Sequence, residues 1–365
     1  MAELQDIPNK PLRRGYTTGA CATACTKAAL YSLVTQQPIK EIPIELPIGE
    51  TVLFKVELVS LSKKEATYAT IKDAGDDPDV THGAEIKATI SFNTKGAIVF
   101  ERGEGVGLVT LPGLEIPVGE PAINPVPRKM MRTVCKKILA DHRLEKNGVT
   151  IRIAVKNGEQ IAKKTLNSRL GILHGISILG TSGIVTPFSA ASYIASIQQG
   201  IDVAIANNKT ELLINSGARS EKMLKALFTD IDPIACVHYG NWIQETFEKI
   251  NESPQIKKVA MGIMLGKASK LAQGNTNTHS GKTTWDKQFI YQLAIDAGYP
   301  KEIANKVLSL NMAGRLREIF TFTDQEKFYQ KLIEKCHYHC KRIAPKVQLD
   351  LYLINNDGHY IKHSL

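Results

Sequence analysis

The stretch Leu212-Leu213-Ile214-Asn215-Ser216-Gly217 decides the fold of the second half of the chain. Three large apolar residues run into a Ser-Gly turn, and a segment with helical character follows through Lys222–Phe228. The same order recurs in Ala235–Asn241 and again in Val259–Lys267. Repeated strand–helix units predict a small parallel sheet with helices on its faces, which is an α/β domain. We expect Leu349–Ile354 to be the last strand of this sheet.

The first half of the chain has many segments in which apolar and polar residues alternate, as in strands, and few segments with a helical pattern. One helix is expected at residues 19–34, with Thr18 as its cap, and a second begins at Pro127, a residue favoured in a first turn. We therefore expect an α+β domain over residues 1–195 and the α/β domain over residues 196–365. The strands of the first domain are expected at Thr51–Val59, Glu65–Asp73, Ala84–Phe92 and Val149–Val155.

Composition narrows the class of protein. The chain has 365 residues, enough for about two domains, and 43% of them are hydrophobic, as in a globular protein with a core. No apolar run is long enough to span a bilayer, and the first residues lack the order of a signal peptide, so we expect a cytoplasmic protein without a membrane partner. The net charge of +10 favours an acidic partner. Only 6% of the residues are aromatic, so the sequence gives little support for a surface on which nucleic-acid bases would stack.

The loop Gly75-Asp76-Asp77-Pro78-Asp79-Val80-Thr81-His82-Gly83 is the strongest candidate site. Three carboxylates, a hydroxyl and an imidazole are crowded between two glycines, although like charges repel. Pro78 stiffens the segment, and a rigid acidic loop between two strands suits a substrate or a metal. A solvated hairpin turn explains the same composition equally well.

A second candidate is the helix start Arg13–Ala24. The free N–H groups of a helix start beside Arg13 and Arg14 form a ready site for a carboxylate or phosphate. Tight helix packing needs the same small residues.

Two glycine-rich segments follow. Glu101–Gly107 imitates the acidic glycine loop of common S-adenosylmethionine (SAM) enzymes, but an extended segment follows it where those enzymes have a helix. Gly171–Gly183 has glycines and hydroxyls that would let the backbone approach a ligand, or that suit a bulged strand in a crowded core.

The three strand ends of the second domain carry Gly217, Gly240-Asn241 and Gly266-Lys267. Ligands of parallel sheets sit beyond the carboxyl ends of strands, so these residues are expected to converge on one edge. His279 lies in a polar loop just downstream and is expected near the same edge.

The six cysteines predict no disulfide framework in a chain of this kind. Helical spacing places Cys336 and Cys340 on one face, which leaves a metal clip open. The second ligand pair of a structural zinc site is missing, however.

Several of these segments together resemble the cobalt-precorrin-5B C(1)-methyltransferases of anaerobic cobalamin biosynthesis. The resemblance covers most of the chain, in order. His174 departs from the Gly-Gly expected there, and Asn275–Asp286 diverges. The segments that carry it are Arg14–Ala22, Gly75–Gly83, Gly103–Gly107, Pro117–Arg128 and Ile176–Val185.

The resemblance implies transfer of a methyl group from SAM to carbon 1 of a cobalt corrinoid, giving cobalt-precorrin-6A. It also implies that the α+β domain resembles a permuted ribosomal-protein-like fold and that the second domain has a small parallel sheet. The substrate brings its own cobalt and many carboxylates, so no protein-bound metal and no nucleic acid are expected, and a homo-oligomer is possible. The resemblance implies no particular catalytic residue.

With this reaction in view, we assign each candidate residue a role. Asp76, Asp77 and His82 are the predicted catalytic group, because they could move a proton on the macrocycle. Arg14, Thr17, Thr18, Thr181 and Ser182 are the predicted substrate-binding group. The predicted cofactor-binding group is Gly103, Gly105, Gly217, Gly240, Asn241, Gly266 and Lys267.

Two other classes of function compete with this interpretation. A basic RNA-binding module would gather Lys and Arg on one face. A phosphoryl-transfer enzyme would use Mg²⁺ at Asp76 and Asp77, although the sequence holds no complete P-loop.

Overall fold

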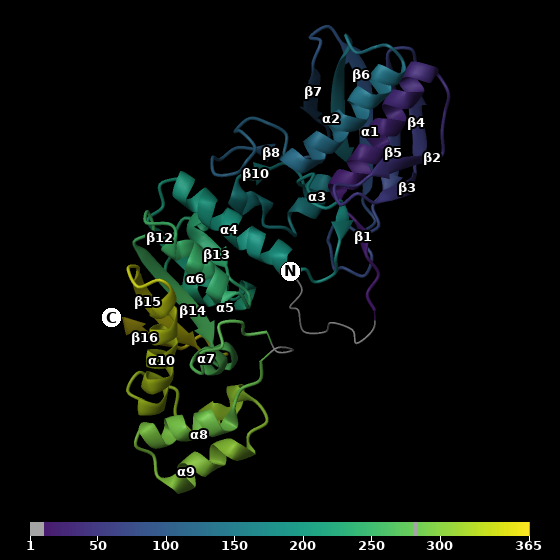
Figure 1. Ribbon diagram of the computed structural model, residues 1–365. Coiled ribbons are helices and arrows are strands. Elements are labelled where there is room, and N and C mark those ends of the chain that lie inside the picture. The colour runs from purple at the N-terminus through teal and green to yellow at the C-terminus, as the bar shows by residue number, and fades with distance from the viewer. Residues whose placement is uncertain (1–10, 280–282, 365) are drawn as a thin grey trace. The chain divides into compact units, whose positions relative to one another are not determined.

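A computed structural model describes residues 11–279 and 283–364 of the chain (Figure 1). The chain divides into two compact units, Met1–Ser189 and Ala190–Leu365. The expected boundary between residues 195 and 196 falls within helix α4 (Ala190–Ala206), which belongs wholly to the second unit. No described helix is both long and apolar enough to cross a membrane.

The first unit is built on a five-stranded sheet in the order β4-β5-β6-β9-β7. Neighbouring strands are antiparallel, except that β7 and β9 run parallel. Helices α1 (Thr18–Thr35) and α2 (Pro125–Asp141) pack together and share one core with the sheet (Figure 1). The strands are β4 (Glu57–Leu61), β5 (Glu65–Ile71), β6 (Glu85–Asn93), β7 (Ile98–Arg102) and β9 (Gly148–Val155).

The single strand expected at Thr51–Val59 is wrong. The chain forms β3 (Thr51–Lys55), which pairs with β2 (Glu41–Glu45) in a hairpin, and then enters β4 of the main sheet. The hydrophobic alternation continues across both strands, so the pattern could not show that the pairing partner changes between them.

Helix α1 is packed from small residues, and its side chains from Thr18 to Thr26 are buried. Its N-cap is Thr17, whose side-chain oxygen accepts a hydrogen bond from the backbone N–H of Ala20. The expected cap at Thr18 is therefore wrong by one residue.

Short strand pairs connect the remaining parts of the first unit. β1 (Gly15–Tyr16) pairs with β11 (Ile184–Val185), and β8 (Leu108–Val109) pairs with β10 (Ile172–Leu173). A short helix, α3 (Gly158–Ala162), follows β9.

The second unit holds the predicted parallel sheet, in the order β13-β12-β14-β15-β16. The first four of these strands are parallel, and β16 (Tyr360–Ser364) adds an antiparallel edge. The sequence predicted that Leu349–Ile354 is the last strand of this sheet, but β16 follows it, so that prediction is wrong. The parallel strands are β12 (Glu211–Asn215), β13 (Cys236–His238), β14 (Lys258–Met264) and β15 (Gln348–Ile354).

Helices cover the sheet of the second unit unequally. Helix α5 (Ala218–Lys225) packs on one face through Leu224. The other face carries the larger core, to which α4, α6 (Ile243–Asn251), α7 (Leu265–Leu271), α8 (Lys287–Asp296) and α10 (Lys327–Ile343) contribute. The short α9 (Lys301–Asn305) contributes Ala304 to that core.

The strand order creates a topological switch point. The chain leaves β12 for β13 on one side, whereas it leaves β14 for β15 on the other side. The carboxyl ends of β12 and β14 are neighbours, and crevices of this kind are where open α/β sheets bind ligands.

Candidate functional site

Three segments that are distant in sequence meet in the first unit. Tyr16 donates a backbone hydrogen bond to Asp73 at 2.7 Å, and Thr17 donates one to Gly183 at 3.0 Å. Glycine is required where they touch, because a Cβ on Gly75 would lie 2.2 Å from the carbonyl oxygen of Arg13. The structure therefore brings together the predicted catalytic group and the predicted substrate-binding group. We call Arg13–Thr18, Lys72–Gly83 and Leu179–Phe188 the three-segment cluster.

The two arginines of the cluster differ in what they bind. The guanidinium of Arg13 donates to both carboxylate oxygens of Asp73, at 2.5 and 2.9 Å, and its backbone N–H donates to Asp76 at 2.8 Å. The hydrogen bond from Arg13 lowers the pKa of Asp73 to about 2. Arg14 is exposed and makes no hydrogen bond or ion pair with any residue that the structure describes. Arg14 is thus the cation that remains for an anionic ligand.

A buried ion pair that we did not predict holds the acidic loop. Lys72 is 1% exposed, and its Nζ lies 2.6 Å from Asp79 Oδ2. The other oxygen of Asp79 accepts hydrogen bonds from the backbone and the hydroxyl of Thr81. Asp79 therefore supports the loop rather than facing solvent. The sequence feature that could have predicted this ion pair is a lysine at the end of a strand of alternating apolar and polar residues, next to the carboxylates of the acidic loop.

The predicted catalytic residues lie in three different environments. Asp76 is exposed, whereas Asp77 is half-buried and accepts a hydrogen bond from the backbone N–H of Phe188 at 2.9 Å. Burial is the main cause that raises the pKa of Asp77. His82 is exposed, and its Nδ1 accepts a hydrogen bond from the backbone N–H of Ala74 at 3.1 Å. In this arrangement the His82 ring carries its proton on Nε2.

The predicted substrate-binding hydroxyls are used to different extents within the protein. Thr18 is 3% exposed, and its hydroxyl accepts from the backbone N–H of Leu179 at 2.9 Å while facing the carbonyl oxygens of Ser177 and Leu179. Ser182 bonds locally to both backbone groups of Ile184. Thr181 is exposed. Among these side chains, Arg14 and Thr181 are the ones best placed to meet a ligand.

The glycines of the Glu101–Gly107 loop contact the protein itself. A Cβ on Gly103 would lie 2.5 Å from the Ile153 carbonyl oxygen, and one on Gly105 would lie 2.1 Å from that of Val155. The backbone of this loop is pressed against the end of β9. This packing accounts for Gly103 and Gly105 without a cofactor.

The predicted glycines of the second unit lie at the carboxyl edge of the sheet. A Cβ on Gly217 or on Gly266 would meet no atom within 4 Å, so both positions border open space. These two glycines follow β12 and β14 and therefore flank the switch point. Gly240 is different, because its φ is +58° and a Cβ there would meet the ring of Tyr193 at 2.7 Å.

Polar contacts tie the loops of this edge together. The Nζ of Lys267 donates to the side-chain oxygen of Asn241. Thr278 is 2% exposed and donates its backbone N–H to the carbonyl of Asn241 at 3.1 Å. The backbone N–H of His279 bonds to the side chain of Asn277, in the same loop. The expected convergence of the strand-end loops on one edge is thus present.

One polar network at this edge was not foreseen. His238, the last residue of β13, lies 2.8 Å from the carboxylate of Glu221 in α5, and Lys225 lies 3.0 Å from the same carboxylate. Both Glu221 and His238 are nearly buried, with side chains 7% and 10% exposed. A glutamate and a lysine four residues apart on a helix were the only signal in the sequence.

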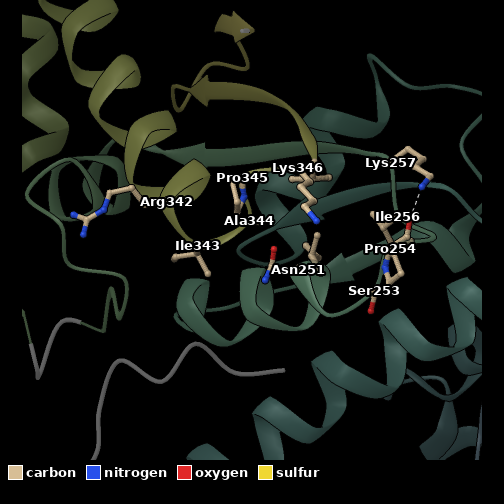
Figure 2. A pocket seen from close by; sticks show the side chains of 12 residues that line it. Asn251, Ser253, Pro254, Ile256, Lys257, Arg342, Ile343, Ala344, Pro345 and Lys346 are labelled. Carbon is tan, nitrogen blue, oxygen red and sulfur yellow. Dashed lines mark hydrogen bonds between the residues drawn. The ribbon is translucent and has the colours of Figure 1, made fainter.

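A pocket of 630 Å³ lies at the opposite edge of the same sheet, just before β14 and β15 begin (Figure 2). Lys257, Arg342 and Lys346 are its cationic residues, and Lys257 donates to the carbonyl of Pro254 at 2.6 Å. Helices α6 and α10 end here, and cations at carboxyl helix ends offset the helix dipole. None of the predicted site residues lines this pocket.

The cysteine pair of α10 belongs to the core. Cys336 and Cys340 are fully buried, and burial raises the pKa of both thiols. Cys336 lies 3.2 Å from the carbonyl of Ala268, and Cys340 lies 4.0 Å from the sulfur of Met261. Within residues 11–279 and 283–364, no group of three or more His, Cys, Asp or Glu side chains could hold a metal ion.

Comparison with known proteins agrees with the resemblance. The model of the CbiD family matches residues 5–187, and the model described as CbiD, C-terminal domain, matches residues 277–364. A solved structure of cobalamin biosynthesis protein (cbiD) from Archaeoglobus fulgidus is 25% identical, covers 74% of this chain and 83% of its own, and has a TM-score of 0.39. A TM-score of this size carries no argument about the fold.

Curated relatives match over most of their length. A cobalt-precorrin-5B C(1)-methyltransferase of Priestia megaterium is 41% identical, over 99% of this chain and 100% of its own. The enzymes of the same name from Geobacillus kaustophilus and Brucella anthropi are 45% and 46% identical, over 90% and 84% of this chain and 87% and 83% of their own. The chain belongs to the CbiD family of cobalt-precorrin-5B C(1)-methyltransferases.

Proposed function

We propose that this protein transfers the methyl group of SAM to carbon 1 of cobalt-precorrin-5B, giving cobalt-precorrin-6A. The observation that carries the proposal is the match to enzymes of that name over almost the entire chain. The names of these relatives give no support to an RNA-binding module or to a phosphoryl-transfer enzyme.

The three-segment cluster is our proposed site for the corrinoid. Its substrate is rich in carboxylates, and Arg14 is an exposed cation that no described residue neutralises. A carboxylate at Arg14 would form a charge-assisted hydrogen bond. The exposed hydroxyl of Thr181 offers a second donor from another segment of the same cluster.

The carboxyl edge of the second sheet is our proposed site for SAM. Gly217 and Gly266 leave room beside the switch point. The loop after β13 presents Asn241, and the first turn of α7 presents Lys267. Gly240 supports this edge through its left-handed turn, against Tyr193. Gly103 and Gly105 are explained by packing, so we no longer assign them to the cofactor.

Bound SAM supplies a methyl group on a sulfonium, which is already electrophilic. The residues of the chain then have to orient the macrocycle and exclude water, and such positioning supplies much of the acceleration in transfers of this kind. If the methylated ring must lose a proton, Asp76 and His82 are exposed within the cluster and could accept or relay it.

The test is an anaerobic assay with methyl-labelled SAM and the cobalt corrinoid. The wild-type protein is expected to place label on the macrocycle, and absence of label from a folded protein would overturn the proposal. Arg14→Met is expected to weaken corrinoid binding roughly tenfold, as loss of one charge-assisted bond implies. Arg13→Met serves as the matched control, because Arg13 is already paired with Asp73.

Three finer features remain predictions. They are the likeness of the first unit to a permuted ribosomal-protein-like fold, a homo-oligomeric state, and work in the cytoplasm without a nucleic-acid partner.

A further inference from the structure

The carboxylate of Asp77 holds a backbone group 111 residues away. Its Oδ1 accepts a hydrogen bond from the N–H of Phe188 at 2.9 Å. Phe188 has a φ of +56°, in the left-handed region that residues with a Cβ disfavour. A phenylalanine stays in this conformation only where its surroundings compensate for the strain, and Asp77 supplies one such contact.

Phe188 also stands at a special place in the chain. It lies two residues before Ala190, which is the first residue both of the second unit and of α4. The preceding residue is Pro187, whose ring fixes φ. Two consecutive residues with constrained backbones therefore end the Leu179–Phe188 segment of the three-segment cluster.

We propose that Asp77 is a positioning residue that locks the backbone of Phe188, and that it moves no proton in the reaction. By fixing the end of the Leu179–Phe188 segment against the acidic loop, it would hold the three-segment cluster in the shape that orients the corrinoid for methylation. The inference rests on the proposed function, with the corrinoid at the three-segment cluster.

The neighbours of Asp77 differ from it in ways that support this assignment. Each of the three accepts one backbone hydrogen bond, but Asp76 and His82 are exposed, whereas Asp77 is half-buried. A lock needs only an acceptor oxygen, which an asparagine also has. A proton-accepting base needs the carboxylate itself.

Asp77→Asn and Asp77→Ala separate the two roles. If Asp77 is a lock, Asp77→Asn keeps single-turnover methyl transfer within about threefold of wild type, while Asp77→Ala lowers it by roughly 10- to 100-fold through misalignment. Corrinoid binding, measured separately, is expected to change less than about twofold in either variant, because Arg14 and Thr181, the side chains proposed to contact the corrinoid carboxylates, are left in place.

Hydrogen exchange provides a readout that does not depend on activity. The amide of Phe188 is itself the donor, so it should be protected in wild type and Asp77→Asn and exchange faster in Asp77→Ala. Asp76→Ala is the matched control, and it should leave the protection of Phe188 unchanged.

Two outcomes overturn the lock. One is loss of transfer in Asp77→Asn while Phe188 stays protected, which would make the carboxylate a base. The other is wild-type transfer by Asp77→Ala. If the wild-type protein transfers no methyl group, the proposed function fails, whereas the exchange of Phe188 in the two variants still tests whether the hydrogen bond is a lock.

Discussion

Lys72 and Asp79 form a largely buried ion pair whose Nζ and Oδ2 atoms are 2.6 Å apart, with the lysine side chain 1% and the aspartate side chain 24% exposed. The backbone of Lys72 also bonds to Ala84 and Gly83 at the far end of the acidic loop. Two kinds of contact thus close the base of the loop that carries Asp76, Asp77 and His82. The geometry of the candidate site depends on a residue outside the predicted catalytic group.

Lys72→Met should destabilise the protein strongly. The change leaves Asp79 partly buried without its cation, and breaking a buried pair in this way costs about 3–5 kcal/mol. Arg13→Met removes a cation from Asp73, whose side chain is 45% exposed, and should cost much less. Urea unfolding of both variants checks the difference, and equal losses would show that burial of Lys72 is not decisive.

Thr18→Val should destabilise the protein, and Thr18→Ser should not. Valine keeps the shape of the buried side chain but leaves the N–H of Leu179 without its acceptor, at a cost of about 1–3 kcal/mol. Serine retains the hydroxyl. Thermal unfolding checks the stability of both variants. Loss of corrinoid binding in a stable Thr18→Val protein would instead assign Thr18 to the substrate.

Gly105→Ala should lower the stability of the protein, whereas Gly217→Ala should leave stability nearly unchanged and weaken SAM binding. Alanine at Gly105 would place a Cβ 2.1 Å from a backbone oxygen at a φ of +71°, so a loss of at least about 1–3 kcal/mol is expected. Alanine at Gly217 meets open space in extended backbone, so stability should change little. Titration calorimetry should show weaker SAM binding for Gly217→Ala. Normal affinity there would remove Gly217 from the proposed cofactor site.

The sequence predicted the parallel sheet because three of its strands are short apolar runs followed by a glycine. The predicted strands Glu65–Asp73 and Ala84–Phe92 are confirmed as β5 and β6, which pair antiparallel, because their apolar and polar residues alternate. These are local patterns, and the structure adds what local patterns cannot carry. The pairing of Gly15 with Val185 joins residues 170 positions apart, and the lock on Phe188 spans 111 positions.

The candidate site was also predictable only in part. The acidic loop was found because its carboxylates and its histidine are crowded into a few residues of sequence. Lys72 was missed because burial of a charge depends on the surrounding fold. Gly103 and Gly105 were assigned to a cofactor because a glycine pressed against backbone and a glycine facing a ligand look alike in sequence.

One buried and one half-buried histidine, His337 and His363, should make the second unit sensitive to acid. The rings of His337 in α10 and His363 in β16 are 4.9 Å apart, and the Nε2 atom of each is buried without a hydrogen-bond partner in the described part of the chain. Burial lowers the pKa of both rings below the usual value, and for His337 the positive charge of His363 and of Lys341 adds to this effect. The hydrogen bond with the backbone of Leu349 and the charge of Asp350 act in the opposite direction on the pKa of His337, as Glu334 does on that of His363.

The sign of the pH effect follows from these shifts. The unfolded chain takes up protons near the ordinary histidine pKa of about 6.5, whereas the folded chain resists until a lower pH. The unfolded state therefore binds more protons, and stability is lost as the pH falls below about 6.5. His363→Phe keeps an aromatic ring against His337 and removes one titrating group. Its melting temperature should fall less than that of wild type between pH 7 and pH 5, while a variant of the exposed His142, His142→Gln, should follow wild type. If the melting temperatures of wild type and His363→Phe fall equally between pH 7 and pH 5, the pair His337 and His363 does not cause the acid sensitivity.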